Sequence, residues 1–424
     1  MPADRVIVLV DGEHHPAVVA EALADLGATR AIAAVVFCGG SEKVSAEALA
    51  RGADLYGHEL TLGSTPVQAL RSALAAHDAD SVVDLADEPR VDTRAKLTLA
   101  AVAGAAGLAY EAPGLRIEPP ELPDLALPQP SVTVIGTGKR TGKTAVCGHL
   151  ARLLKEREMN PVIVSMGRGG PADPVIAQPG TGLDELQRLA AAGVHAASDY
   201  LEDAAIANVP AVGCRRIGGG PGGRTWQTNF AAGARLASRQ PGAECLLFEG
   251  SGATIPPARA DSTICVAGGA DQALELDGPL RLALADLVLV PEHAGEITDA
   301  VAEFTDARVA TFELRPTLCE PVPPGASVAF FSTGPGQLHD VEPVFVSRNL
   351  ADRAALESDL AAAVIAGCTH YAIEIKAAAI DMVAAAATRE GANVVFVRNE
   401  PVSEHDPIDE ILVDIHSLAV ARRM

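Results

Sequence analysis

The sequence predicts an α/β protein built on parallel sheets, and three observations support this. Short strands rich in valine and isoleucine alternate with alanine-rich helical segments over most of the 424 residues. A glycine-rich turn ending in Gly142-Lys143-Thr144 directly follows one such strand. Prolines cluster between residues 119 and 130, as in a connection between folded units. We expect a central doubly wound parallel sheet, an N-terminal Rossmann-like α/β domain and a smaller C-terminal α/β region.

A chain of this length exceeds what one hydrophobic core normally serves. We place the domains at residues 1–125, 126–320 and 321–424. The strands expected in them are Arg5–Asp11, Ala33–Phe37 and Ser81–Leu85 in the first; Val132–Gly136, Pro161–Ser165, Val209–Gly213, Glu244–Phe248, Ser262–Val266 and Asp286–Val290 in the second; and Val328–Phe331, Val344–Val346, Tyr371–Ile375 and Asn393–Val397 in the third.

Composition narrows the class of partner. The formal net charge is −22, so a nucleic-acid partner is not expected, because such proteins normally carry a basic surface. An anionic small molecule would need a local basic pocket. No segment has the pattern of a signal peptide or of a membrane span, and the seven scattered cysteines resemble reduced, buried thiols. We therefore expect a cytoplasmic protein that does not bind membranes.

The run from Val132 to Thr144 predicts a phosphate-binding loop for ATP. Glycines let the backbone wrap a polyphosphate, Lys143 would meet the terminal phosphates, and the Thr144 hydroxyl would hold Mg²⁺. The usual spacing would place the first glycine at Thr137, but it lies one residue earlier, at Gly136. The alternative is a chance Gly-Lys-Thr in a surface turn. The remaining residues expected to contact the nucleotide are Gly138, Arg140, Thr141 and Gly142.

A carboxylate that helps to place Mg²⁺ is expected at the end of a neighbouring buried strand. Glu249 has this position, because Cys245–Phe248 is an apolar run and Gly250-Ser251-Gly252 follows. The alternative is a solvated glutamate at a strand end. Asp199 and the pair Glu202-Asp203 are further candidates to orient a metal or arginines, or they lie on a solvated helix face.

Two glycine-rich segments carry arginines suited to a phosphate. Arg168 stands between glycines after the strand 161–165, where it could bind phosphate in a bidentate fork. Arg215, Arg216 and Arg224 lie in a second segment with five glycines in eleven residues. The alternatives are a tight turn with an exposed arginine for the first segment and a mobile glycine loop for the second.

Charged residues also follow strands in the two outer domains. Asp11, Glu13 and His14 come directly after the first strand, where open parallel sheets bind ligands. They could hold a metal or cofactor or move protons, or they could form a polar turn with a helix cap. In the third domain, Arg348 or Lys376 could contact phosphate. Lys376 could instead form an ion pair with Asp381 or Glu374.

These motifs resemble two families. The loop from Gly136 to Thr144, with its displaced first glycine, and the Glu249–Gly252 segment are similar to those of dethiobiotin synthetase. Over nearly its whole length the chain resembles cyclic 2,3-diphosphoglycerate synthetase. The motifs that carry the second resemblance are Asp11-Gly-Glu-His-His-Pro16, the phosphate loop, Met166-Gly-Arg-Gly-Gly-Pro171, Ser198-Asp-Tyr-Leu-Glu-Asp203 and Glu374-Ile-Lys-Ala-Ala-Ala379.

The second resemblance implies ATP- and Mg²⁺-dependent closure of 2,3-diphosphoglycerate into its cyclic phosphoanhydride, with release of ADP and phosphate. On this basis, Lys143 and Lys139 would serve ATP, and Thr144 and Glu249 would serve Mg²⁺. The arginines 168, 215, 216 and 224 would hold substrate or the phosphoryl group in transfer. A homodimer is also expected. The alternatives are a kinase that makes 2,3-diphosphoglycerate from 2-phosphoglycerate, a ligase of the dethiobiotin kind, and a P-loop switch or metal-chaperone ATPase without a small-molecule product.

Overall fold

Two sheets organise the molecule, and the structure, a computed structural model, describes residues 4–424. The first sheet has 6 strands in the order β3-β2-β1-β4-β5-β6. The second is a 13-stranded sheet in the order β11-β10-β8-β12-β7-β13-β14-β15-β19-β18-β16-β17, and β9 pairs with β10 beside this path. Strand pairs are parallel in most of both sheets. The predicted α/β class is therefore confirmed.

The N-terminal unit contains the first sheet. Its strands are β1 (Arg5–Val10), β2 (Ala31–Phe37), β3 (Leu60–Thr61), β4 (Ser81–Asp84), β5 (Ala109–Ala112) and β6 (Leu115–Ile117). Its helices are α1 (Pro16–Gly27), α2 (Ala46–Leu49), α3 (Ala53–Tyr56), α4 (Pro66–Ala76) and α5 (Thr93–Ala105). Sequence signals fix where these helices begin: the Asp92 side chain accepts from the Ala95 N–H at 2.8 Å and so starts α5. Helix α5 packs on α11 (Gly278–Ala283) of the next unit.

The central unit contains the phosphate loop. Its strands are β7 (Ser131–Gly136), β8 (Pro161–Gly167), β9 (Val175–Ala177), β10 (Ala211–Ile217), β11 (Gln227–Thr228), β12 (Cys245–Gly250), β13 (Ser262–Val266) and β14 (Leu287–Pro291). Its helices are α6 (Lys143–Glu156), α7 (Leu183–Ala191), α8 (Asp199–Glu202), α9 (Phe230–Ser238), α10 (Ala270–Ala273), α11 (Gly278–Ala283) and α12 (Thr298–Val301). A π-helical turn follows α8 over Asp203–Ala207, and 3₁₀ turns cover Pro221–Gly223 and Glu292–Ile297.

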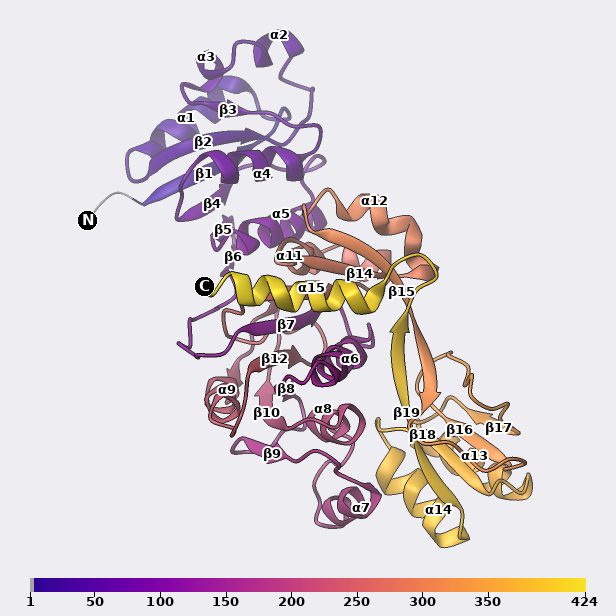
Figure 1. Cartoon of the computed structure of the whole chain (residues 1–424). Coiled ribbons are helices and arrows are strands. Elements are labelled where there is room, and N and C mark those ends of the chain that lie inside the picture. The colour runs from indigo at the N-terminus through magenta and orange to yellow at the C-terminus, as the bar shows by residue number, and fades with distance from the viewer. Residues whose placement is uncertain (1–3) are drawn as a thin grey trace.

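The C-terminal unit extends the central sheet. Strand β15 (Arg308–Leu318) first runs parallel to β14 and then pairs antiparallel with β19 (Asn393–Val402). Figure 1 shows these two strands leaving the central unit together. The other elements are β16 (Val328–Phe331), β17 (Phe345–Ser347), β18 (His370–Glu374), α13 (Arg353–Ile365), a π-helical turn (Ala379–Ala384), α14 (Ala385–Glu390) and α15 (Ile408–Ala421). Helix α15 returns to pack on α6, β7 and β13 of the central unit.

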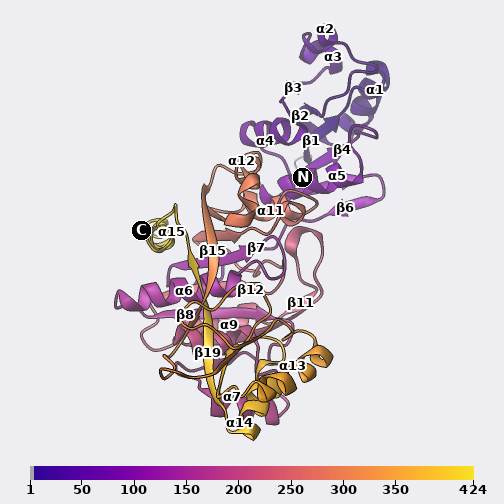
Figure 2. The same ribbon diagram turned by 90° about the vertical axis from the view of Figure 1, so that its right-hand side faces the viewer.

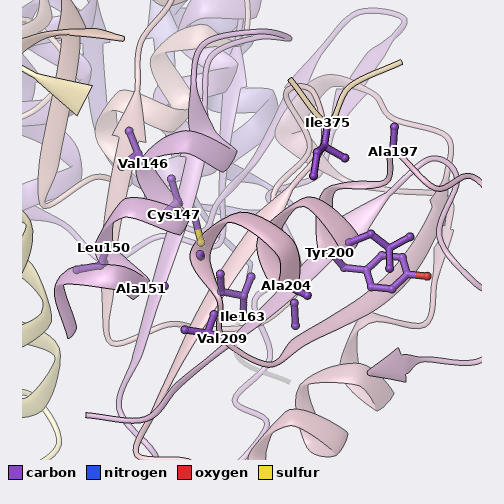
Figure 3. Close-up of a cluster of buried hydrophobic side chains, with 14 of the residues drawn as sticks. Val146, Cys147, Leu150, Ala151, Ile163, Ala197, Tyr200, Ala204, Val209 and Ile375 are labelled. Atoms are coloured by element: carbon purple, nitrogen blue, oxygen red, sulfur yellow. The ribbon is translucent and has the colours of Figure 1, made fainter. Parts of the chain in front are cut away.

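The N-terminal unit and helices α13 and α14 lie at opposite ends of the molecule, with the central unit between them (Figures 1 and 2). Within the central unit, α6, α8 and the following π-helical turn cover one face of the sheet. Figure 3 shows Val146 and Leu150 of α6, Ile163 of β8 and Tyr200 of α8 in the resulting core. This packing fixes α6 and α8 relative to the strand ends that form the site.

The predicted strands are present. Most of their ends are shifted only slightly, and one strand has a larger shift. The segment predicted at 209–213 becomes β10, which continues to Ile217. The longest strand, β15, was missed because Pro316 and three charged residues interrupt its apolar pattern. All seven cysteines are free, and six are buried as predicted, whereas Cys319 is partly exposed. No helix within residues 4–424 is both long and apolar enough to cross a membrane.

Candidate active site

The phosphate loop joins β7 to the amino terminus of α6. Strand β7 is completely buried up to Gly136, and α6 begins at Lys143, directly after Gly142. Gly142 has φ +102°, a value that glycine adopts without strain. The amide groups of the first turn of α6 have no side-chain cap, so this end of the helix is suited to an anion.

The displaced first glycine of the loop has a steric reason. A Cβ atom on Gly136 would lie 2.6 Å from the Thr141 hydroxyl oxygen and 2.9 Å from the carbonyl oxygen of Val266. A side chain at this position would force the loop away from β13. Gly136 therefore needs to be glycine even though it lies one residue before the usual place.

Lys143 points into the loop. It is only 7% exposed, and its ammonium group donates to the Gly138 carbonyl oxygen at 2.7 Å and lies 3.3 Å from the Thr141 hydroxyl. Burial lowers the pKa of Lys143 to about 8, although the carboxylates of Glu249 and Asp199 act to raise it. A buried ammonium group with so few partners is ready to exchange a carbonyl oxygen for a phosphate oxygen.

The other predicted loop residues divide into buried and exposed groups. Thr137 is buried, and its hydroxyl accepts from the Gly268 N–H at 2.8 Å. A Cβ atom on Gly138 would meet the Gln272 side chain at 2.3 Å, so Gln272 covers this part of the loop. Lys139 and Arg140 are exposed, and Arg140 has φ +65°. They lie on the outer side of the loop.

Glu249 lies where the sequence predicts it, on the strand between β7 and β8. Its Oε1 accepts from the Ser165 hydroxyl at 2.8 Å, and its Oε2 is buried without a hydrogen-bond partner among residues 4–424. Burial, with the nearby Asp199 carboxylate, raises the pKa of Glu249 to about 7, and the Ser165 hydroxyl acts against this rise. An unpartnered carboxylate oxygen at this position and the Thr144 hydroxyl beyond the loop are a donor set that fits Mg²⁺.

The acidic residues of α8 face the same region. Glu202 forms an ion pair with Lys376 of the C-terminal unit, with Nζ and Oε2 2.5 Å apart. Burial raises the pKa of Glu202 to about 7 against the effect of Lys376, and burial next to Glu249 raises the pKa of Asp203. The ion pairs expected as one alternative for Lys376 do not form: Asp381 pairs with Arg353, and Glu374 accepts from Thr333 and Asn399. Lys376 instead joins two units.

A cavity of about 1050 Å³ opens at the carboxyl ends of β8, β10 and β12, where residues of the segments 168–170, 215–221 and 253–254 line it. Arg168 and Arg215 line it, and neither side chain has a hydrogen bond or carboxylate partner within residues 4–424. Arg216 also lines it and is held by the Ser251 carbonyl at 2.8 Å and the Gly218 carbonyl at 2.8 Å. In a chain with net charge −22, two unpaired arginines at one cavity indicate an anion site.

Close packing brings two of these arginines together. A Cβ atom on Gly252 would lie 3.3 Å from an amino group of Arg168 and 3.4 Å from one of Arg216. Burial lowers the pKa of Arg216, and the charge of Arg168 lowers it further. An anion between the two guanidinium groups would relieve this repulsion.

Arg281 and Leu97 were not predicted from the sequence. Arg281 is 1% exposed, and its Nε donates to the Ala253 carbonyl at 2.8 Å, which holds the segment after Glu249. Leu97 belongs to α5 and gives the N-terminal unit a share of the cavity wall. No local motif marks either residue, because both lie on helices of ordinary composition.

Three groups of candidate residues lie apart from this cavity. Arg224 pairs with Glu121 and is not among the residues that line it. Arg348 donates to the Gly334 carbonyl at 2.8 Å within the C-terminal unit. Asp11 and its neighbours follow β1, a strand of the other sheet. The structure does not bring these groups to the phosphate loop.

Asp11 has a local structural role. It is fully buried and accepts from the His14 ring at 2.8 Å, the His14 N–H at 3.1 Å and the Asp87 N–H at 2.6 Å. Burial acts to raise the pKa of Asp11, but these donors hold it below its usual value. Residues 4–424 contain no group of three or more His, Cys, Asp or Glu arranged to hold a metal, so Asp11, Glu13 and His14 do not form one.

The strand order at the site defines the class of protein. Four neighbouring strands bring the candidate residues to one edge of the sheet: the phosphate loop follows β7, Arg168 follows β8, and Glu249 and Arg215 lie in the last residues of β12 and β10. This is a P-loop protein of the α/β class with a cationic cavity next to its loop.

Comparison with known proteins identifies the family. The models of the N-terminal, P-loop and C-terminal domains of cyclic 2,3-diphosphoglycerate synthetase match residues 5–118, 131–303 and 325–400. The chain is 39% identical to the synthetase of Rubrobacter xylanophilus over 94% of this chain and 95% of that one. It is 32% identical to that of Methanothermobacter thermautotrophicus over 99% and 97%. The chain belongs to the cyclic 2,3-diphosphoglycerate synthetase family, and its synthetase relatives and P-loop domain indicate an enzyme.

Proposed function

We propose that this protein uses ATP to convert 2,3-diphosphoglycerate into its cyclic phosphoanhydride, with release of ADP and phosphate. The observation that carries the proposal is the presence of two anion sites at one edge of the same sheet, separated by strand β12 with Glu249. One is the phosphate loop after β7, and the other is the cavity with Arg168 and Arg215 at the ends of β8 and β10. The names of the relatives supply the product, cyclic 2,3-diphosphoglycerate, and its open-chain form is the proposed substrate.

The reaction balances in two displacements. First, an oxygen of one substrate phosphate attacks the γ-phosphorus of ATP, the bond to the β-phosphate oxygen breaks, and ADP leaves. Second, an oxygen of the other substrate phosphate attacks the phosphorus of the activated phosphate and expels the transferred group as inorganic phosphate. The new P–O–P bond closes the ring. No covalent nucleophile on the protein is required.

Electrostatic stabilisation is the main task of the protein in such a reaction. Two dianionic phosphates must approach each other beside a triphosphate, and their repulsion grows once water is excluded. Lys143 and the amides of the loop bind ATP, with Lys139 and Arg140 on the outer side. Arg168, Arg215 and Arg216 hold the substrate.

The donor set at Glu249 and Thr144 supports Mg²⁺ as the metal. Bound there, Mg²⁺ would neutralise part of the phosphate charge. Glu249 and Thr144 would provide the oxygen ligands, and the Ser165 hydroxyl fixes the Glu249 carboxylate by its 2.8 Å hydrogen bond. Two further parts of the proposal are a cytoplasmic location, supported by the seven free cysteines, and a homodimer. Light scattering after size exclusion tests the dimer.

Phosphorus NMR of the protein with ATP, Mg²⁺ and 2,3-diphosphoglycerate tests the proposal. We expect a new internal phosphoanhydride signal together with equal amounts of ADP and phosphate. Consumption of ATP with 2-phosphoglycerate and formation of 2,3-diphosphoglycerate would instead establish a kinase. ATP hydrolysis at a rate that depends on neither 2,3-diphosphoglycerate nor 2-phosphoglycerate would favour a switch ATPase.

A further inference from the structure

The C-terminal sheet presents its carboxyl edge to the central unit. The strands β16, β18 and β19 are parallel, so their carboxyl ends lie together. Glu374, at the end of β18, is buried and accepts from the Thr333 N–H at 2.9 Å and the Asn399 amide at 2.9 Å. The Lys376 N–H donates to the Glu374 carbonyl at 2.8 Å. The three strand ends are tied together, and Lys376 is anchored on them.

From this anchor, the Lys376 side chain reaches helix α8 and binds Glu202 at 2.5 Å. Glu202 lines a pocket of about 20 Å³ together with Thr144 and Gly148 of α6 and Arg398 of β19. The ion pair therefore lies next to the first turn of the helix that begins at the phosphate loop.

Helix α8 links this ion pair to the cationic part of the site. Asp199 and Glu202 are three residues apart, so their side chains share one face of the helix. A Cβ atom on Gly167 would lie 3.8 Å from the Asp199 carboxylate, which places Asp199 at the end of β8. The Asp199 charge acts on both Lys143 and Arg216.

Loss of the ammonium group would leave α8 with uncompensated charge. Asp203, the next residue along, already has a buried carboxylate oxygen with no hydrogen-bond partner in the described part of the chain. A second buried carboxylate without a cation is costly, so Glu202 would take up a proton or move towards water, and in either case α8 would lose its bond to the C-terminal unit. Asp199 would then be held less firmly.

We propose that Lys376 is a positioning residue of the phosphoryl-transfer site: by binding Glu202 it fixes α8, and α8 fixes Asp199 beside Lys143 and Arg216. The C-terminal unit then contributes to the chemical step although it does not carry the phosphate loop. The proposal rests on the proposed function for the identity of the reaction.

Steady-state kinetics of Lys376→Met and Lys376→Arg test this role. We expect Lys376→Met to lower kcat by about tenfold or more, because Asp199 is no longer held in place. A tenfold loss corresponds to roughly 1.4 kcal/mol of transition-state stabilisation. The KM values for ATP and substrate should change much less, because the binding groups remain. Lys376→Arg should restore most of kcat. The control is Arg353→Met, which breaks an exposed ion pair in the same unit and should leave kcat unchanged.

A double-mutant cycle separates positioning from general destabilisation. Glu202→Gln should lower kcat, and adding Lys376→Met should cause little further loss, because the two residues act as one unit. Additive losses, or a Lys376→Met protein with the wild-type kcat, would overturn the proposal. If Lys376→Met does not fold, Lys376→Arg decides: a folded arginine variant without activity also overturns it.

Hydrogen exchange with AMP-PNP and Mg²⁺ gives a readout that does not depend on the substrate. In the wild type we expect nucleotide to slow exchange in residues 199–207 and also in residues 371–376. In Lys376→Met the second effect should disappear. Absence of protection at 371–376 in the wild type contradicts the link, whereas intact protection without cyclic product contradicts only the proposed reaction.

Discussion

Lys143 is charged inside a buried loop, and this affects how nucleotide binding depends on pH. Burial lowers its pKa to about 8 in the free protein. A bound triphosphate stabilises the ammonium form, so the pKa in the complex must be higher. Below pH 8 the lysine is already charged. Above pH 8 ATP binding must take up a proton, and affinity falls as pH rises until the pKa of the complex is reached.

We therefore predict weaker ATP binding at pH 9 than at pH 7. At pH 9 the uptake of protons on binding should approach one per ATP. Calorimetry in two buffers of different ionisation enthalpy measures this uptake. Lys143→Met should remove the uptake, and Lys143→Ala should lower turnover on the order of a thousandfold. Equal affinity at both pH values would contradict the assigned role of this lysine.

We make opposite predictions for Arg168 and Arg224, although both arginines lie in glycine-rich segments of the sequence. Arg168 lines the cavity and has no side-chain partner among the described residues 4–424, whereas Arg224 is paired with Glu121 outside the cavity. Arg168→Ala should weaken 2,3-diphosphoglycerate binding on the order of tenfold to a hundredfold, the usual effect of losing hydrogen bonds to a charged group. ATP affinity should be retained.

Arg224→Ala is the matched control and should bind substrate almost as the wild type does. Isothermal titration with both ligands measures the two affinities. Equal losses in the two variants would mean that the cavity is not the substrate site.

At the scale of elements, local chemistry explains what could be predicted from the sequence. The phosphate loop and Glu249 were predictable because a buried strand, glycines and a charged residue are adjacent in the chain. Strand β15 was not, because it changes partner from β14 to β19 halfway and its pattern follows neither neighbour alone. The Lys376–Glu202 pair joins residues 174 positions apart, and no local pattern encodes it.

The packing of α8 on β10 depends on a glycine. Tyr200 lies over Gly213, where a Cβ atom would be 2.6 Å from the ring. Gly213→Ala should push α8 outward and cost about 1–3 kcal/mol of stability, as overpacking does in other cores. It should also lower kcat, because Asp199 is on this helix.

Thermal melting and kinetics of Gly213→Ala measure both effects. Gly295→Ala is the control, since a Cβ atom there meets nothing within 4 Å. A variant with lower stability but full kcat would show that small shifts of α8 do not reach the site.

At the scale of the whole molecule, the two outer units contact the central unit next to the candidate active site. The C-terminal unit shares its sheet with the central unit, and α15 packs against β7 and β13. The boundaries predicted at residues 125 and 320 stay predictions, and limited proteolysis with mapping of the cut sites would test them. The sequence could not predict that the N-terminal unit contributes to the cavity, because the contact of α5 with α11 exists only in the folded chain.

Leu97 tests whether the N-terminal unit takes part in substrate binding. It lies on α5, is partly exposed and lines the cavity that contains Arg168, Arg215 and Arg216. Leu97→Glu would bring a carboxylate to these cations, where it would compete with the anionic substrate. We expect KM for 2,3-diphosphoglycerate to rise about tenfold or more, the equivalent of roughly 1.4 kcal/mol.

The glutamine in Leu97→Gln has nearly the same shape as the glutamate in Leu97→Glu but carries no charge. Comparison of the two variants therefore separates electrostatic competition from altered packing. We expect the glutamine variant to stay within about threefold of the wild-type KM, a difference below roughly 1 kcal/mol. Both variants should bind ATP normally, because the phosphate loop is on another strand end. Equal effects of glutamate and glutamine would mean that Leu97 supports the interface between the units, and that substrate charge is not sensed at this wall. A rise confined to glutamate would make the N-terminal unit part of the substrate site.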